Sequence, residues 1–372
     1  HKILRRTGRI LQSAPNLVTA VNALLFLFAS ATFGVRKALK TTLITLADPK
    51  ANSVLYRLTS LLTGFFRGLF RSDLRWQALP VPFVVYADGI DLVVFEEFGA
   101  GQAALHLADQ VKRNHLMKDE AYRRRFRRDY ETRFTPRVWH RDFSDAYVDA
   151  CPDASLVGKS FGQIAEEREL HVVDLFLDLV VEYGRSLRWH TLIANHRPEV
   201  RARMMCNPDA LIGFADSGAH IRNMAFYNVP LRVLCAVRDA EIAGSPIMPI
   251  ERAVHRLTGE IADWLGVDAG HLREGDRADM VIIDPEALDA RLDVYHEAPM
   301  DRFGSLVRMV NRSDGTVSAV LVNGRVAFHD GAFAPDLGQR TGFGSFLPAG
   351  QRPAPSEAGR EPRPELVMEA AE

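Results

Sequence analysis

Residues 211–220, LIGFADSGAH, place an acid directly after an apolar run. The apolar residues lead into Asp216, and Gly218 follows two residues later, which predicts a short buried strand that ends in a turn with the acid at its tip. In a barrel of parallel strands, the carboxyl ends of the strands and the loops after them build the active site. We therefore predict a catalytic role for Asp216. A helix N-cap at Asp216 or Ser217, for a helix beginning near Met224, is the structural alternative.

Downstream of this stretch, glycines, acids and apolar residues recur in a defined order up to residue 333. Together with Asp216, this order resembles the C-terminal part of the amidohydrolase superfamily, specifically its branch of N-acyl-D-amino-acid deacylases and D-aminoacylases. The resemblance is strong from residue 211 to residue 333 and weaker upstream. The matching residues are Pro249, Ala253, Leu257, Thr258, Ala262, Leu265, Gly266, Gly270, Gly275, Ala278, Asp279, Asp284, Val322, Asn323, Gly324 and Gly331.

The resemblance implies an α/β fold, namely an incomplete (β/α)8 TIM-type barrel with a small C-terminal β-sandwich segment. We expect the barrel in residues 1–262 and the β-sandwich segment in residues 263–344. Residues 345–372 are rich in Pro, Ala, Glu and Arg with few large apolar groups, which predicts a disordered tail.

The resemblance also implies the chemistry. Members of this branch bind a metal and hydrolyse the amide of an N-acylated D-amino acid, and their strand-end acid binds the metal and takes a proton from the attacking water. Both roles fall to Asp216 here, with zinc as the expected metal. His220 is expected to contact the substrate or to hold Asp216, and Arg222 and Asn223 to bind the substrate carboxylate. A solvent-exposed loop is the alternative for Arg222 and Asn223, and Ala215 stands where the family usually has Ser.

Two features depart from the family's pattern. The family has a His-x-His pair that supplies two metal ligands, and no such pair occurs in this sequence, which opens on His1 and is interpreted as a fragment. The strand predicted within residues 40–49, KTTLITLADP, ends in Asp48, where many relatives have a metal-binding His. Because Asp48 precedes Pro49, we favour a turn over an oxygen ligand for zinc.

Histidines elsewhere give weaker signals. The segment RVWHRDF places Trp139, His140 and Asp142 either in a pocket wall or strand-end site, or in a surface turn, and both alternatives stay open. His190 and His196 lie six residues apart without a third partner nearby, a spacing more typical of packed side chains than of metal ligands.

Apolar periodicity predicts the remaining elements. Residues 76–99 offer two strands joined by a turn at Asp88-Gly89, which form either a hairpin or an insertion near the substrate pocket. The other β segments are a strand within 187–196, a buried strand at 280–283 and a hairpin that turns at Asn323-Gly324. The helices are expected within residues 23–39, 102–134, 161–169, 172–184 and 198–210.

Composition excludes several partners. The 372 residues carry 46 Lys and Arg against 47 Asp and Glu, and this balance gives no reason to expect a nucleic acid partner. Residues 13–35 lack charge, but polar residues interrupt them and the continuous apolar run at residues 23–29 is too short to span a bilayer, so no membrane partner is expected. The three cysteines include no CxxC pair, which indicates a reducing compartment and a cytoplasmic location. Homo-oligomerisation is left open.

Three hypotheses for function follow. The first is a metal-dependent deacylase that acts on N-acyl-D-amino acids as small-molecule substrates, and the second is a cyclic-amide hydrolase of the same superfamily, similar to dihydropyrimidinase or dihydroorotase. The long insertion at residues 74–149 favours the first. The third is a degenerate scaffold that binds a ligand without hydrolysing it, because a fold alone does not establish a function. The fragment alone is expected to be inactive.

Overall fold

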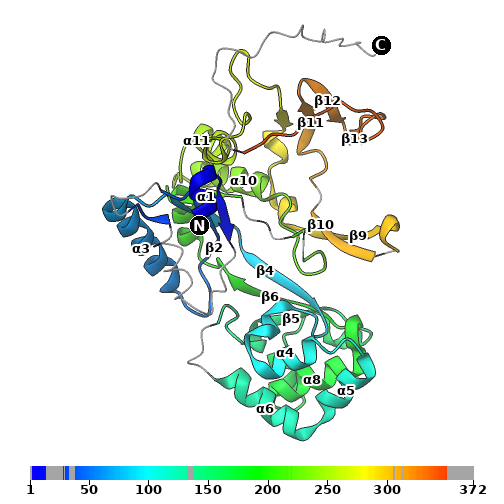
Figure 1. Ribbon diagram of the computed structural model, residues 1–372. Helices are drawn as coiled ribbons and strands as arrows, with labels where there is room; N and C mark the ends of the chain where they lie inside the picture. The colour runs from blue at the N-terminus through cyan, green and yellow to red at the C-terminus, as the bar shows by residue number, and fades with distance from the viewer. Residues whose placement is uncertain are drawn as a thin grey trace.

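The computed structural model describes residues 2–13, 28, 30–32, 38–132, 137–213, 215, 217–218, 220–304, 306–311 and 313–349. These residues form an α/β structure with a parallel sheet, a mixed helical and antiparallel unit, and a C-terminal β region (Figure 1). Most of the predicted helix within residues 23–39 and most of the predicted disordered tail lie outside the described residues.

The parallel sheet has the strand order β1-β2-β3-β7. Its strands are β1 (Leu11–Ser13), β2 (Thr41–Leu46), β3 (Leu74–Ala78) and β7 (Ala210–Ile212), and every neighbouring pair is parallel. Helix α3 (Leu55–Phe70) forms the crossover between β2 and β3, and α9 (Pro198–Cys206) precedes β7. All three residues of β7 are buried, as expected for a parallel strand covered on both faces. The predicted α/β class is confirmed, whereas this sheet has two edges, β1 and β7, within the described residues.

The second part is built on a three-stranded antiparallel sheet of order β4-β6-β5. Its strands are β4 (Phe83–Asp88), β5 (Ala146–Ala150) and β6 (Arg188–Ala194). β4 and β6 run side by side from the parallel sheet to a cluster of helices (Figure 1). The helices are η1 (Val93–Glu97), α4 (Gly99–Leu105), α5 (Gln110–Lys118), α6 (Glu120–Glu131), η2 (Phe143–Asp145), η3 (Ala154–Leu156), α7 (Phe161–Glu167), α8 (Val172–Tyr183) and η4 (Gly184–Ser186).

Aromatic side chains form the centre of this second part. Phe95, Phe143, Phe161, Phe176 and Trp189 are all fully buried. The Phe143 and Phe176 rings stack with their centroids 4.5 Å apart, and Phe161 meets Phe176 edge to face at 5.3 Å. Stacked and edge-to-face pairs of this kind add to the stabilisation that burial itself provides.

The hairpin predicted to turn at Asp88-Gly89 is wrong. β4 does end at Asp88, directly before Gly89, but the chain then enters the 3-10 helix η1, and β4 pairs with β6 instead. The apolar run after the turn was the misleading signal, because burial of Val94 and Phe95 against the aromatic core explains it without a second strand. The helices predicted within residues 102–134, 161–169, 172–184 and 198–210 and the strand within 187–196 are confirmed where they fall on described residues.

The C-terminal region follows α10 (Val229–Ile242), α11 (Ile250–Leu257) and α12 (Gly259–Leu265). One antiparallel sheet has the order β13-β12-β11-β8, and a separate ribbon pairs β9 (Tyr295–Met300) with β10 (Leu306–Asn311). The strands of the first sheet are β8 (Met280–Ile283), β11 (Val317–Val322), β12 (Arg325–His329) and β13 (Ala332–Phe333), and the short helices η5 (Pro285–Ala287), η6 (Ala290–Asp293) and η7 (Asp301–Phe303) lie between β8 and β10.

Two strand predictions in this region have different outcomes. The hairpin is confirmed, because Asn323 and Gly324 join β11 to β12 with positive φ angles of 51° and 79°. The strand at 280–283 forms, but the prediction that it is buried is wrong, since Val281 and Ile282 are each 54% exposed. Among the described residues no second sheet covers it, so the β-sandwich and the division of the chain at residue 262 stay predictions.

Replacing Phe176 with alanine tests the aromatic core. The change removes a fully buried ring that contacts Phe95, Phe143 and Trp189 and leaves a cavity. We expect Phe176→Ala to lower the free energy of unfolding by about 3–5 kcal/mol in urea titrations. The matched control Phe346→Ala removes a largely exposed ring and is expected to change it by less than about 0.5 kcal/mol. Equal losses in both variants would contradict this description of the core.

Candidate functional site

The carboxyl end of β2 leads into Asp48, which is fully buried. The Arg197 guanidinium donates to both carboxylate oxygens of Asp48, with Nε 2.8 Å from Oδ2. The backbone N–H of Asp48 donates to the side-chain oxygen of Asn195 at 2.8 Å. The backbone N–H of Asn195 donates in turn to the backbone carbonyl of Asp48 at 2.9 Å. The carboxylate is therefore held by an arginine rather than presented as a ligand for zinc.

A second polar cluster lies two residues further along the chain. Lys50 donates to the Asp145 carboxylate, and His140 Nε2 lies 2.9 Å from Asp145 Oδ2. The Lys50 amide donates to the carbonyl of Ile193 in β6, which places the cluster beside the end of β2. We call Lys50, His140 and Asp145 the strand-end triad. Sequence reasoning singled out His140 but not its two partners, because Lys50 and Asp145 are 95 residues apart.

His140 therefore belongs to a strand-end cluster, and the surface-turn alternative is wrong, since its side chain is only 12% exposed. Burial is the main cause that lowers the pKa of His140, and the Lys50 cation adds to it, while Asp145 acts in the opposite direction. Its neighbour Trp139 is fully buried in the aromatic core. Asp142, the acid two residues away, does not orient the histidine but accepts a hydrogen bond from the Ser144 amide at 2.8 Å.

His190 and His196, the other two histidines considered as metal ligands, are packed side chains, as the sequence favoured. His190 Nδ1 lies 2.7 Å from Asp149 Oδ1, and the ring stacks with Tyr147 at 5.8 Å between centroids. His196 follows Asn195, and burial is the main cause that lowers its pKa. Neither belongs to a metal-binding cluster of described residues.

The loop after β7 is irregular. Ser217 Oγ accepts a hydrogen bond from the Phe226 amide at 2.8 Å and donates to the Ala215 carbonyl at 3.1 Å. In the fully described range 220–304 no helix begins near Met224, and the next helix is α10 with Asn228 at its N-cap. The N-cap alternative for Ser217 is therefore wrong. Asp216 itself lies outside the described residues, so its catalytic role stays a prediction.

The residues expected to contact the substrate fasten this loop to β4. Arg222 donates to Asp88 through Nε and Nη2, both at 2.9 Å, and its Nη1 lies 3.1 Å from Glu297 in β9. The hydrogen bonds to Asp88 are the main cause that raises the pKa of Arg222. Asn223 Nδ2 donates to the carbonyls of Tyr86 at 2.7 Å and Asp91 at 3.1 Å.

These contacts bear on two of the sequence expectations. Arg222 and Asn223 are half-buried and hydrogen-bonded, so a solvent-exposed loop does not describe them. His220 is also half-buried, and its carbonyl accepts hydrogen bonds from the amides of Asn223 and Met224 at 2.8 and 3.0 Å. Contact of the three side chains with a substrate stays a prediction.

The metal donors of the described residues do not match the expected metal site. Within the part of the chain that the structure describes, no group of three or more His, Cys, Asp or Glu side chains could hold a metal ion. Cys151, Cys206 and Cys235 are free thiols that lie after β5, in α9 and in α10, respectively. The described residues thus do not form a metal site by themselves.

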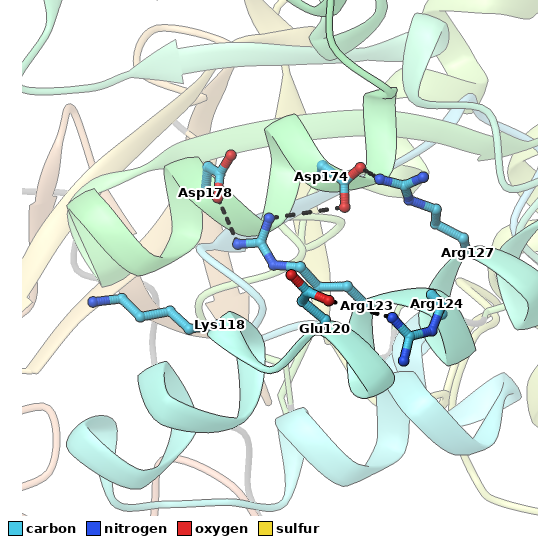
Figure 2. Close-up of a pocket in the computed structure, with 7 residues that line it drawn as sticks. All are labelled: Lys118, Glu120, Arg123, Arg124, Arg127, Asp174 and Asp178. Atoms are coloured by element: carbon cyan, nitrogen blue, oxygen red, sulfur yellow. Dashed lines mark hydrogen bonds and ion pairs between the residues drawn. The ribbon is translucent and has the colours of Figure 1, made fainter.

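A surface hollow lies elsewhere, between α6 and α8 (Figure 2). Most of its charges are paired with one another: Arg123 contacts Asp174 and Asp178, and Arg124 lies 3.4 Å from Glu120. It includes none of the predicted site residues. Among the described residues, no helix is both long and apolar enough to cross a membrane.

Comparison with solved structures finds deacylases, the class whose motifs residues 211–333 resemble. A D-aminoacylase, from work on its binuclear metal center, is similar with a TM-score of 0.48 and 17% identity, over 93% of this chain and 57% of that one. The N-acyl-D-glutamate deacylase of Bordetella bronchiseptica, complexed with zinc and a phosphonate inhibitor, is similar with a TM-score of 0.47 and 16% identity, over 88% of this chain and 55% of that one.

Sequence comparison finds longer relatives. Uncharacterized proteins of Mycobacterium bovis and Mycobacterium tuberculosis are 51% identical to this chain over 356 residues. The match covers 94% of this chain and 58% of each relative, so the chain spans less than three fifths of their length. No protein-family model matches the chain.

The lowered pKa of His140 predicts a pH dependence of stability. Because the folded protein binds this proton more weakly than the unfolded chain does, stability is fully present above the unfolded pKa of about 6.5 and falls as the pH drops below it. We expect His140→Gln to flatten the decline in unfolding free energy between about pH 6.5 and pH 5, measured by urea titration. The control His115→Gln changes an exposed histidine on α5 and should leave the decline as in the wild type. Parallel pH profiles for His140→Gln and the wild type would refute the prediction.

Proposed function

We propose that the full-length protein is a metal-dependent amidohydrolase that cleaves the amide of N-acyl-D-amino acids. One observation carries the proposal: the GFADSGAH motif follows β7, a buried strand of a parallel sheet. The carboxyl ends of such strands are where barrel enzymes carry their catalytic groups. The residues after it match the deacylase branch in order up to residue 333.

Asp216 is the proposed metal ligand and general base. It follows Ile212, the last residue of β7, by four positions. A bound divalent metal, zinc in this proposal, would lower the pKa of the water that it binds and would polarise the amide carbonyl. The Asp216 carboxylate accepts the proton of the attacking water and returns it to the leaving amine, a contribution of about a hundredfold or more. Further metal ligands would come from the part of the relatives' length that this chain does not span.

His220, Arg222 and Asn223 are the proposed substrate contacts. All three lie within seven residues of Asp216, on the loop that packs against β4. To bind a substrate carboxylate, Arg222 has to exchange one of its two carboxylate partners, and Glu297 is the one it contacts through a single nitrogen. The guanidinium of Arg222 already donates to carboxylates, so it has the geometry to bind the carboxylate of a substrate in the same way.

A non-catalytic scaffold is the second candidate, and the state of Asp48 favours it. Where the family pattern has a metal-binding His, Asp48 is buried and held by Arg197. The absence of a three-donor cluster among the described residues points the same way. The insertion predicted at 74–149 begins too early, because residues 74–78 form β3 of the parallel sheet. The cyclic-amide hydrolase is less favoured, because residues 83–149 fold into part of the unit around β4, β5 and β6.

The variant Asp216→Asn separates these candidates. In the full-length protein with bound metal, we expect N-acetyl-D-amino acids to be hydrolysed in preference to their L enantiomers, and the variant to lose at least a hundredfold in kcat/KM. Metal content by elemental analysis should fall in the same variant. The matched control Asp314→Asn changes an exposed acid of the C-terminal region and should keep full activity and metal.

The opposite outcomes are equally informative. A full-length protein that binds no metal and hydrolyses neither enantiomer is the scaffold. Preferential hydrolysis of cyclic amides over N-acyl amino acids would replace the deacylase with the cyclic-amide hydrolase.

Arg222→Lys tests the proposed substrate contact. If Arg222 binds the substrate carboxylate, KM should rise at least tenfold, because lysine keeps the charge but loses the paired geometry of the guanidinium. If Arg222 only fastens the loop to Asp88, the unfolding free energy should fall while KM stays unchanged. Steady-state kinetics and urea titration of the same preparation distinguish the two results.

A further inference from the structure

Helix α3 presents apolar side chains on two opposite sides. On the inner side, Tyr56, Thr63 and Phe66 are buried against the parallel sheet, where Thr63 Oγ1 accepts a hydrogen bond from Trp76 at 2.8 Å. On the outer side, five large residues spaced four, three, four and four apart share one face. These residues, which we call the α3 ridge, are Val54, Leu58, Leu61, Phe65 and Leu69, with exposed fractions of 63, 51, 72, 56 and 61%.

The outer position of the ridge means that the parallel sheet cannot cover it. α3 lies on the outside of the sheet, at the left margin of the molecule in Figure 1. Further strands would join the sheet at its edges, β1 or β7, and extend it sideways under the inner side of the helices. The ridge presents on the order of 500 Å² of apolar surface, a size at which exposed patches mark interaction sites.

The charges around the ridge are of one sign. Residues 49–72 contain four basic residues and no acid, and one of the four, Lys50, pairs with Asp145 in the strand-end triad. Arg67 pairs with Asp209 beside the sheet, whereas Arg57 and Arg71 are exposed at the two ends of α3. An apolar face of Leu and Phe with basic residues at its margins is typical of helices that lie in the interface of an anionic bilayer.

A second copy of the chain fits the ridge less well. Two ridges packed about a twofold axis would bury about 1,000 Å² in total, less than the roughly 1,200 Å² at the lower limit of stable interfaces. A twofold axis would also bring the arginines of α3 toward those of the partner, and α3 has no acid to pair with them. An anionic lipid surface satisfies both the apolar ridge and the cations.

We propose that the α3 ridge docks the full-length protein on the surface of an anionic lipid bilayer, with α3 lying in the plane of the interface. Leu58, Leu61 and Phe65 enter the acyl boundary, and Arg57 and Arg71 contact the headgroups. This proposal is opposed to the sequence expectation of no membrane partner, which was argued from residues 13–35. It is independent of the proposed hydrolase activity.

Vesicle cosedimentation of the full-length protein tests the proposal. We expect binding to vesicles of phosphatidylcholine with a quarter phosphatidylglycerol, and binding at least tenfold weaker to phosphatidylcholine alone. Leu61→Ser with Phe65→Ser should weaken binding to the anionic vesicles at least tenfold, because two apolar side chains no longer enter the interface. Arg57→Gln with Arg71→Gln should weaken it severalfold on anionic vesicles only.

The control Ile242→Ser with Leu272→Ser removes two apolar side chains that are at least as exposed, on α10 and in the loop before β8, and should bind as the wild type does. Circular dichroism and thermal melting confirm that each variant is folded. Three results overturn the proposal: no binding to anionic vesicles, equal loss in the ridge and control variants, or a dimer in light scattering that only the ridge variant abolishes.

Discussion

The buried ion pair between Asp48 and Arg197 is the constraint on which the rest of the arrangement depends. Asp48 is fully buried at the end of β2, and an unpaired carboxylate there would cost several kcal/mol. Arg197 supplies the charge, and Asn195 supplies the remaining contacts, since its side chain joins the Asp48 amide to the carbonyl of Leu79 after β3. One junction thus fixes the ends of β2, β3 and β6, where the antiparallel sheet leaves the parallel one.

The loop that carries the proposed catalytic acid depends on this junction indirectly. β4 pairs with β6 and ends at Asp88, which accepts hydrogen bonds from Arg188 of β6 and from Arg222 of the loop after β7. Asp88 and Arg222 are 134 residues apart in the chain. The inserted unit therefore does more than cover the sheet. It holds the segment that follows Asp216, so the shape of a substrate pocket here would be set jointly by the parallel sheet and the insertion.

The local sequence pattern predicted which helices and strands form better than it predicted which of them pack or pair with one another. The Asn323-Gly324 hairpin and helices α7 and α8 follow from turn chemistry and apolar period alone, and all three form as expected. The Asp88-Gly89 hairpin failed because an apolar run after a turn fits a strand and a buried 3-10 helix equally well. The same limit applies to the candidate site: the motif at Asp216 is local, whereas Lys50, His140 and Asp145 meet only through tertiary folding.

Helix α3 shows the same limit on the surface of the protein. Apolar residues occur on both sides of the helix, so the apolar periodicity of the sequence does not predict which side packs in the core. The inner side of α3 is defined by Tyr56 and Phe66, which pack against the parallel sheet. The opposite side, with five large apolar residues, is then left exposed. An exposed apolar surface of this size lowers the solubility of a protein, and surfaces of this kind usually mark an interaction site. Lys50 and Arg67 are paired with Asp145 and Asp209, whereas Arg57 and Arg71 are exposed at the two ends of α3, and these two cations favour an anionic partner for the ridge.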